Sequence, residues 1–587
     1  MPSTAAEGYK KPPRKRPPKP RTEPLRRGKA CLNCRHLKIR CDGARPVCGP
    51  CTRVPKDDEC EYTDGSSRTK SLEATIARLK ARVSELENAD SPPPRLPSDP
   101  ELGRLGVSPS LSPAISSSAS DVSGFPSSRD SESSHSFLGF QEPPPDMLEM
   151  LLDAFLPHCV QFGFFMHPAR FRAAAILQLP LGHPSRPSPA LLCAVYLWGV
   201  HLSRSEPMVT YEGLFIRRAQ QHIATELSNN VHPAHRIHTI QAHILLSSYF
   251  LRNKQLLEAE FHANGAITLA LGYRMHQIRS SRAPSPPLLG SASSSPETVL
   301  PPPTDPVEEG ERIRGFWMLV CHQTSLLMSI RTPGNTFSIL EAPGLQIDTP
   351  WPFELGEYEL GMMSADLRSS DTIDEFLVHG ISGSASPFAL QAQATVLLQR
   401  AVQLARRWTP GMQLQAVSAH ASSSAWLETR IQQLQTQVSL VSTFYQQTEE
   451  TRTLSLIQAL LHAAIIHLHK SDTGDRSASL AAARGILAVF TDPDADTGDD
   501  LSCTGPVAGT LLLLACQLIL REIERTRYLR ASMGTTLNAD AAYKQEEASL
   551  LVDLQNGLTT MTLFALDSPL GQYQLSKVQH KCDSLGL

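Results

Sequence analysis

Apolar residues recur at helical spacing through most of the chain after residue 145. Spacings of three and four residues, with few of the alternating patterns typical of strands, predict an all-α domain over residues 146–587. The clearest predicted helices are residues 146–155, 189–202, 211–227, 237–251, 256–271, 312–330, 390–407, 454–469 and 510–528.

Two stretches interrupt this pattern with Ser and Pro. Residues 89–145 and 283–306 have too few apolar side chains to form a core, so we expect a disordered linker and a disordered surface insert. Shorter polar breaks at about 369–387, 472–477 and 491–505 divide the helical body without ending it.

A short heptad pattern precedes the first disordered linker. Its apolar positions are four, three, four and three residues apart, with β-branched residues at a and Leu at d, which favours a parallel two-stranded coiled coil. The seam consists of Leu72, Ile76, Leu79, Val83 and Leu86. The alternative is an amphipathic helix packed on the helical body, but the polar and disordered flanks favour a homodimer.

The charge of the chain is strongly segregated. Its 55 Lys and Arg against 58 Asp and Glu give a net charge of −3 over 587 residues. Residues 1–56 hold 16 basic and three acidic side chains, a local charge of +13, so the remainder carries −16. A basic head indicates a polyanionic partner, most commonly nucleic acid. The Pro-rich basic arm at 1–29 is typical of a nuclear import signal; the alternative is a solubilising tail.

The apolar runs and the cysteines indicate which cellular compartment the chain occupies. The longest apolar runs, near residues 190–202 and 509–520, are shorter than the 18 or more residues of a membrane span, so we expect no membrane partner. No apolar stretch follows the N-terminal charges, which argues against a secretory signal and for a reducing compartment. In such a compartment a cysteine cluster is best interpreted as a set of metal ligands.

Six of the twelve cysteines lie within thirty positions. They are Cys31, Cys34, Cys41, Cys48, Cys51 and Cys60, a half-motif that is repeated once. Two zinc ions need eight ligand positions, so six thiolates suffice only if two of them bridge. The symmetric choice is that Cys31 and Cys48 bridge, with Cys34 and Cys41 on one ion and the last two cysteines on the other. Such closed sites hold a fold and leave no position for catalysis.

Only the first half of the motif suits a phosphate surface. Arg35, Lys38 and Arg40 lie between its cysteines with no acidic residue, whereas Asp57, Asp58 and Glu59 outweigh the basic residues of the second half.

The six cysteines, the basic residues between Cys34 and Cys41, and Pro46 together form a motif that resembles that of the fungal binuclear zinc-cluster transcription factors. The resemblance implies double-stranded DNA as partner, with Lys38 reading bases of CGG-like triplets and Arg35 and Arg40 binding phosphates. The alternative for Lys38 is a phosphate contact that reads no sequence. The resemblance further implies a nuclear regulator of RNA polymerase II genes that binds the transcription machinery or co-regulators.

The helical body offers weaker signals. Two stretches resemble the fungal-specific middle-homology regulatory domain that accompanies such clusters: residues 261–273, and residues 311–318 leading to Arg331. In the first, Gly265 and the neighbouring Ala positions allow close helix packing, and Gly272 is expected to cap the helix. A metal site among His232, His235, His238 and His243 is less favoured than ordinary surface or core histidines, because their spacing is irregular and no carboxylate partner is adjacent.

No phosphate loop, metalloprotease motif or nucleophile elbow is found, so we expect no enzyme. The alternative is a helical effector-binding or enzymatic domain that the zinc cluster tethers to DNA.

The predicted fold class is therefore mostly α. It comprises a basic disordered arm (1–29), a two-zinc, six-cysteine DNA-binding module (30–62), a linker with a dimerising coiled coil (63–88), a disordered linker (89–145) and an all-α regulatory domain (146–587) with a disordered insert (283–306).

Overall fold

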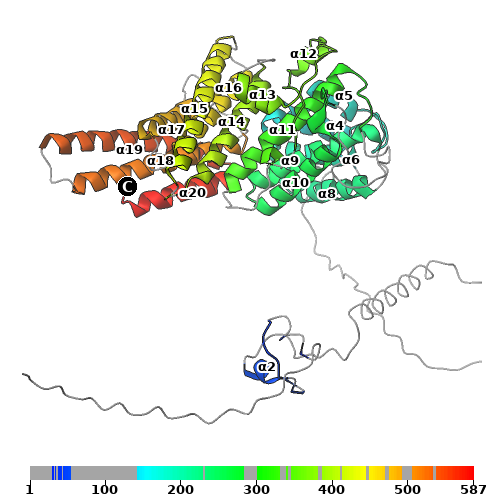
Figure 1. Ribbon diagram of the computed structural model, residues 1–587. Helices are drawn as coiled ribbons and strands as arrows, with labels where there is room; N and C mark the ends of the chain where they lie inside the picture. Colours follow the sequence, from blue (N-terminus) through cyan, green and yellow to red (C-terminus); the bar gives the residue numbers. More distant parts are fainter. Residues whose placement is uncertain are drawn as a thin grey trace, which may run out of the picture. The chain divides into compact units, whose positions relative to one another are not determined.

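The computed structural model describes most of the chain after residue 141 and a few segments before it (Figure 1). The described residues are 30–31, 34, 38–42, 44–45, 47–53, 142–228, 232–282, 300–330, 339–341, 345–380, 386–409, 411, 413–444, 449–469, 475–491, 505–532 and 537–587. The chain divides into two units, one within residues 1–125 and one within residues 126–587. Within the described residues the regular elements are helices, and the two paired residues Ser280 and Ser369 form an isolated bridge.

The larger unit is all-α, as predicted. Its helices are α4 (Pro145–Phe155), η2 (Leu156–Phe162), α5 (Pro168–Ala175), α6 (Pro189–Ser203), α7 (Glu206–Val209), α8 (Glu212–Ser228), α9 (Arg236–Arg252), α10 (Leu256–Gly272), α11 (Pro306–Ile330), α12 (Leu355–Glu359), α13 (Thr372–His379), α14 (Pro387–Arg407), α15 (Leu414–Ser442), α16 (Glu449–Leu468), α17 (Arg476–Thr491), α18 (Val507–Ser532), α19 (Leu537–Ala565) and α20 (Pro569–Ser584). None of the described helices is long and apolar enough to cross a membrane.

The first part of the core lies around α6 and α9, which neighbouring helices cover on all sides. Both helices are buried around most of their circumference; α6 is apolar almost throughout, whereas α9 also buries polar side chains such as Gln241, Ser247 and Ser248. Trp198 of α6 stacks on Phe162 with ring centroids 3.9 Å apart, and its indole N–H donates to the Leu245 carbonyl at 3.0 Å. The buried indole is therefore both packed and hydrogen-bonded.

Helix α11 joins the two parts of the larger unit. It packs on α9 and α10 on one side and on α14 and α18 on the other, and lies between the two groups of helices in Figure 1. Trp317 of α11 stacks on Trp351 at 4.2 Å and donates to the Pro350 carbonyl at 2.7 Å. The 25-residue helix is buried along most of its length, which explains the apolar pattern over residues 312–330.

Serine followed by proline begins three of these helices. Ser188, Ser386 and Ser568 are the N-caps of α6, α14 and α20, and their side-chain oxygens accept from backbone amides three residues later at 3.4, 3.1 and 3.2 Å. Proline at the first helical position loses no hydrogen bond, because that amide has no partner inside the helix. These caps explain why α14 begins before the apolar pattern does.

Helix α11 also begins earlier than its apolar pattern predicts. Asp305 is followed by Pro306, and its Oδ1 accepts from the Glu308 amide at 2.9 Å, as an N-cap does. Residues 300–305, expected in the disordered insert, are described: Leu300 packs against the core and the Pro301 carbonyl accepts from Arg312 at 2.6 Å. The remainder of the predicted insert lies outside the described residues.

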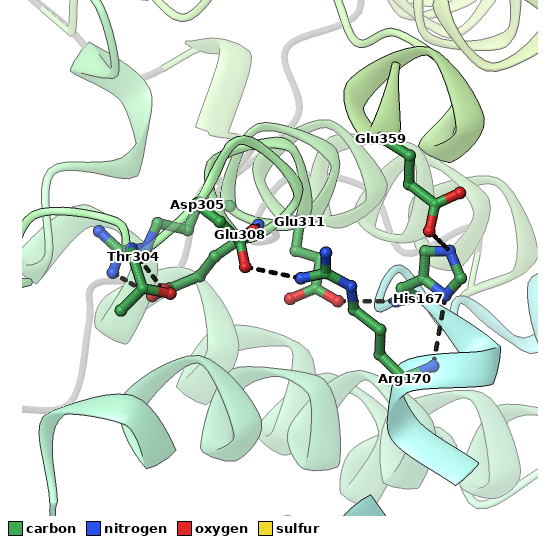
Figure 2. Close-up of polar contacts among 8 residues, drawn as sticks. His167, Arg170, Thr304, Asp305, Glu308, Glu311 and Glu359 are labelled. Carbon is green, nitrogen blue, oxygen red and sulfur yellow. Dashed lines mark hydrogen bonds and ion pairs between the residues drawn. The ribbon is translucent and has the colours of Figure 1, made fainter. Parts of the chain in front are cut away.

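A line of polar contacts joins the start of α11 to α5 and α12 (Figure 2). Arg170 of α5 forms an ion pair with Asp305 at 2.7 Å, and the His167 amide donates to Glu311 Oε1 at 2.8 Å. His167 Nε2 lies 3.0 Å from Glu359. Burial raises the pKa of Glu311, although the His167 amide and Arg170 favour its carboxylate form.

Close helix packing explains one of the two glycines predicted to matter in residues 261–273. A Cβ on Gly265 would lie 2.6 Å from a ring carbon of His243, so α10 approaches α9 as closely as the small residues predict. Gly272 is the last helical residue, but Arg274 adopts the left-handed conformation, with φ of 56°. The helix end is confirmed, while the prediction that Gly272 takes the capping conformation is wrong.

Candidate zinc centre and DNA interface

Four of the predicted zinc ligands converge in the smaller unit. Cys31, Cys34, Cys41 and Cys48 are buried, and one sulfur from each lies within 4.8 Å of all the others. Sγ of Cys48 is 3.6 Å from both Cys31 and Cys34. The cluster brings together cysteines up to 17 residues apart in the sequence. Among the described residues of this segment, the regular element is the single-turn helix α2 (Gly49–Arg53).

The sulfur spacing fits a tetrahedral zinc ion. Zn–S bonds of about 2.3 Å in a tetrahedron place neighbouring sulfurs about 3.8 Å apart. The distances of 3.6 Å from Cys48 to Cys31 and Cys34 are close to this value. Burial also raises the pKa of the Cys34 and Cys48 thiols, so a bound cation is needed to hold them as thiolates.

Cys51 extends this cluster. Its Sγ lies 3.8 Å from that of Cys31, while Cys31 is also 3.6 Å from Cys48. Cys31 is therefore close to Cys51 as well as to the group of four buried cysteines, which is the position expected of a bridging ligand. Cys60, the sixth predicted ligand, lies outside the described residues.

Asp42 connects the two halves of the motif. Its carboxylate accepts from the Gly49 amide at 3.0 and 3.1 Å and from the Ala44 amide at 3.2 Å. It lies at the start of α2, and a Cβ on Gly49 would come within 2.4 Å of its Oδ2. Sequence reasoning missed this contact; the signal was an Asp directly after Cys41 and a Gly directly after Cys48.

Basic side chains of the first half face solvent. Lys38 and Arg40 are exposed, and Ile39 between them is 47% exposed. The Ile39 amide donates to the Cys34 carbonyl at 3.0 Å, and Lys38 has a φ of 53°, so the backbone turns at Lys38. The turn presents the two cations next to the cysteine cluster; Arg35 lies outside the described residues.

Comparison with protein families agrees with this geometry. The model of the fungal Zn(2)-Cys(6) binuclear cluster domain matches residues 29–69, which include all six predicted ligands. The chain carries a fungal zinc-cluster domain. The resemblance stated from the cysteine spacing and the basic run is thereby confirmed.

The chain is similar over part of its length to proteins that are named as transcription regulators. A transcriptional coactivator of the notoamide biosynthesis cluster from Aspergillus versicolor is 36% identical over 85 residues, 14% of this chain and 15% of the relative. The transcriptional activator protein acu-15 from Neurospora crassa is 44% identical over 64 residues, 10% and 7% of the two chains. A sorbicillinoid biosynthetic cluster transcription factor from Hypocrea jecorina is 28% identical over 185 residues, 29% and 27%.

These similarities are partial. The matched segments span 27% or less of the length of each of these relatives. No solved structure matches the chain.

The remaining predicted features have different outcomes. The five seam residues of the predicted coiled coil, the basic arm and residues 492–504 of the last polar break lie outside the described residues. The four histidines at 232–243 form no metal-binding group in the described part of the chain. Instead His235 Nε2 bonds the Arg186 carbonyl at 3.0 Å, and His238 Nδ1 accepts from the Ser188 amide at 3.1 Å.

Proposed function

We propose that the chain is a nuclear, sequence-specific regulator of RNA polymerase II genes whose zinc-cluster domain reads DNA. The observation that carries the proposal is a zinc-sized thiol cluster with two exposed cations, Lys38 and Arg40, on the turn beside it. Its matched relatives are named as regulators of transcription. Buried thiolates with no open position for water suit a structural metal better than a catalytic one.

Two zinc ions per chain complete the domain in this proposal. One ion takes Cys31, Cys34, Cys41 and Cys48, and the other takes Cys31, Cys48, Cys51 and Cys60. The short separation of Cys31 from both Cys48 and Cys51 supports the bridging role of Cys31. Metal analysis of the full chain is expected to give two zincs, and Cys60→Ser is expected to retain fewer than two.

DNA is read by the first half of the motif. Lys38 contacts the guanines of a CGG-like triplet, because a lysine donates to O6 and N7 in the major groove. Arg35 and Arg40 bind phosphates and set the register without reading sequence. The predicted coil of residues 72–86 pairs two chains, so the target holds two triplets, and the acidic remainder stays off DNA and meets co-regulators.

The helical unit serves regulation in this proposal. Its order after the zinc-cluster domain and the closely packed α10 and α11 support the middle-homology assignment. In the second candidate function, the helical unit binds an effector and the zinc-cluster domain tethers it to DNA. A cavity between α11, α14, α16, α18 and α20 favours this candidate.

A pair of variants tests the DNA-reading role. Lys38→Ala in the full chain is expected to weaken binding to a CGG duplex by about 1–3 kcal/mol and to relax the preference for guanine. The matched control is Arg53→Ala, because Arg53 is also exposed but lies on α2 in the second half of the motif. If both variants lost the same affinity, and lost it equally on CGG and scrambled duplexes, Lys38 would contact phosphates only.

A further inference from the structure

A cavity of about 430 Å³ lies in the larger unit, far along the sequence from the zinc-cluster domain. It is formed where the C-terminal ends of α11, α14 and α16 meet α18 and α20, with His420 of α15 also on its wall. Its volume falls in the range of about 300–1,000 Å³ that holds small organic molecules.

Apolar side chains line much of the cavity. The lining includes Leu327, Val402, Leu513, Leu514 and Leu570, which come from four different helices, and Trp408. Walls contributed by several helices of one packed unit are preformed, so a ligand there loses little free energy in ordering the protein.

One side of the cavity carries an oriented set of polar groups. Ser329 Oγ donates to the Ser325 carbonyl at 2.8 Å, so Thr510 is the donor in the 2.9 Å contact between their hydroxyls. Thr510 in turn accepts from Gln574 Nε2 at 2.9 Å. A Cβ on Gly509 would lie 2.5 Å from Gln574 Oε1, so glycine at this position leaves room for that amide.

The charged groups around the cavity are cationic. Arg406 and Lys577 line it, and no Asp or Glu is among the described residues that do. The ring of Tyr573, also in the lining, lies close to two ammonium groups: its centroid is 4.2 Å from Lys577 Nζ and 3.8 Å from Lys254 Nζ. The hydrogen bond from Lys577 lowers the pKa of Tyr573, as a positive local potential does.

We propose that this cavity binds one small organic anion with an apolar body. The apolar walls hold the body, Arg406 and Lys577 pair with the acid group, and the hydroxyl and amide side fixes the orientation. A neutral compound of the same shape gains only the apolar part of this interaction, and a cationic one is repelled.

Two aromatic probes of matched shape test the proposal on the full chain. Anilinonaphthalene sulfonate carries an acid group, and phenylnaphthylamine has the same ring system without it. We expect saturable fluorescence enhancement by the sulfonate with one site in the cavity. In the double variant Arg406→Gln, Lys577→Gln its affinity is expected to fall about tenfold, while that of phenylnaphthylamine changes less than twofold.

Control variants separate the cavity from other basic surfaces. Arg407→Gln alters the neighbouring residue of α14, which does not line this cavity, and is expected to leave both affinities unchanged. Leu514→Trp fills the cavity and is expected to remove the saturable site for both probes; Leu514→Phe replaces it if circular dichroism shows a loss of helix. Lys38→Ala leaves probe binding intact, so this test is independent of the DNA-reading proposal.

Three results would overturn the proposal. They are saturable binding that survives filling the cavity, sulfonate affinity that is unchanged in the double variant, and equal losses for the charged and uncharged probes.

Discussion

His322 on α11 makes the helical unit sensitive to acid. Its Nε2 lies 2.7 Å from Ser247 Oγ, and its Nδ1 lies 3.4 Å from Ser248 Oγ. The hydroxyls of Ser247 and Ser248 already donate to the Ala259 and Phe162 carbonyls at 2.7 and 2.9 Å. The imidazole must therefore donate to Ser247 through Nε2–H. Burial keeps the ring neutral, so Nδ1 carries no proton.

Burial lowers the pKa of His322 from 6.5 to about 4. The unfolded chain takes up the proton first as the pH falls, so the stability present above pH 6.5 is lost progressively down to pH 4. At about pH 5 the unfolded histidine is mostly protonated and the folded one is mostly neutral. The difference makes the unit about 2 kcal/mol less stable at pH 5 than at pH 7.5 through this residue alone.

Urea unfolding of the full chain, followed by far-ultraviolet circular dichroism, measures this effect. His322→Gln keeps a donor for Ser247 and removes the titration, so its loss of stability between pH 7.5 and pH 5 should be about 2 kcal/mol smaller than that of the unaltered chain. His580→Gln is the control, because His580 is exposed on α20 and should behave as the unaltered chain does. Equal losses for the unaltered chain and His322→Gln would refute the reasoning.

Three further predictions address pairing, charge and packing. Ile76→Asp with Val83→Asp should reduce binding to a two-triplet duplex far more than to a single triplet in a gel-shift titration; equal losses would contradict a dimer. Glu311→Gln keeps its acceptor oxygen and avoids a buried carboxylate whose pKa is raised, so melting should show a gain in stability near pH 7.5 that disappears towards pH 4. A gain at all pH values would exclude this cause. Gly310→Ala, whose Cβ would lie 2.4 Å from an aromatic ring, should cost about 1–3 kcal/mol in urea unfolding, whereas Gly356→Ala meets nothing within 4 Å and should cost less; equal costs would contradict the packing.

Helices with a broad apolar face could be predicted from the sequence, and those with a narrow one could not. All nine predicted helices are present, with ends within a few residues at most boundaries. Helix α15 was not predicted, because it buries only the narrow stripe of Leu427, Ile431, Leu434 and Val438, and Gln, Ser and Thr are frequent in the rest of the helix. Helix α13 lies within the expected polar break at 369–387, and α20 buries only a narrow stripe that includes Leu570, Val578 and Cys582. Caps and narrow stripes carry less sequence information than a fully buried helix.

The zinc site was predictable because its ligands are chemically distinctive and close in sequence. Cysteine spacing identified the four thiols that converge, and charge identified Lys38 and Arg40 as exposed cations. The bond from the Gly49 amide to Asp42 was not predictable, because it depends on the fold that the metal ligands impose. The cavity in the helical unit was also missed, since its lining comes from six helices spread over 250 residues.

The most direct test of the central claim is a random-sequence DNA selection with the zinc-loaded full chain, repeated after zinc removal by chelation. The account predicts enrichment of duplexes that hold two CGG-like triplets at one fixed separation, and no enrichment without zinc. Enrichment of unrelated sequences, or the same enrichment with and without zinc, would contradict it.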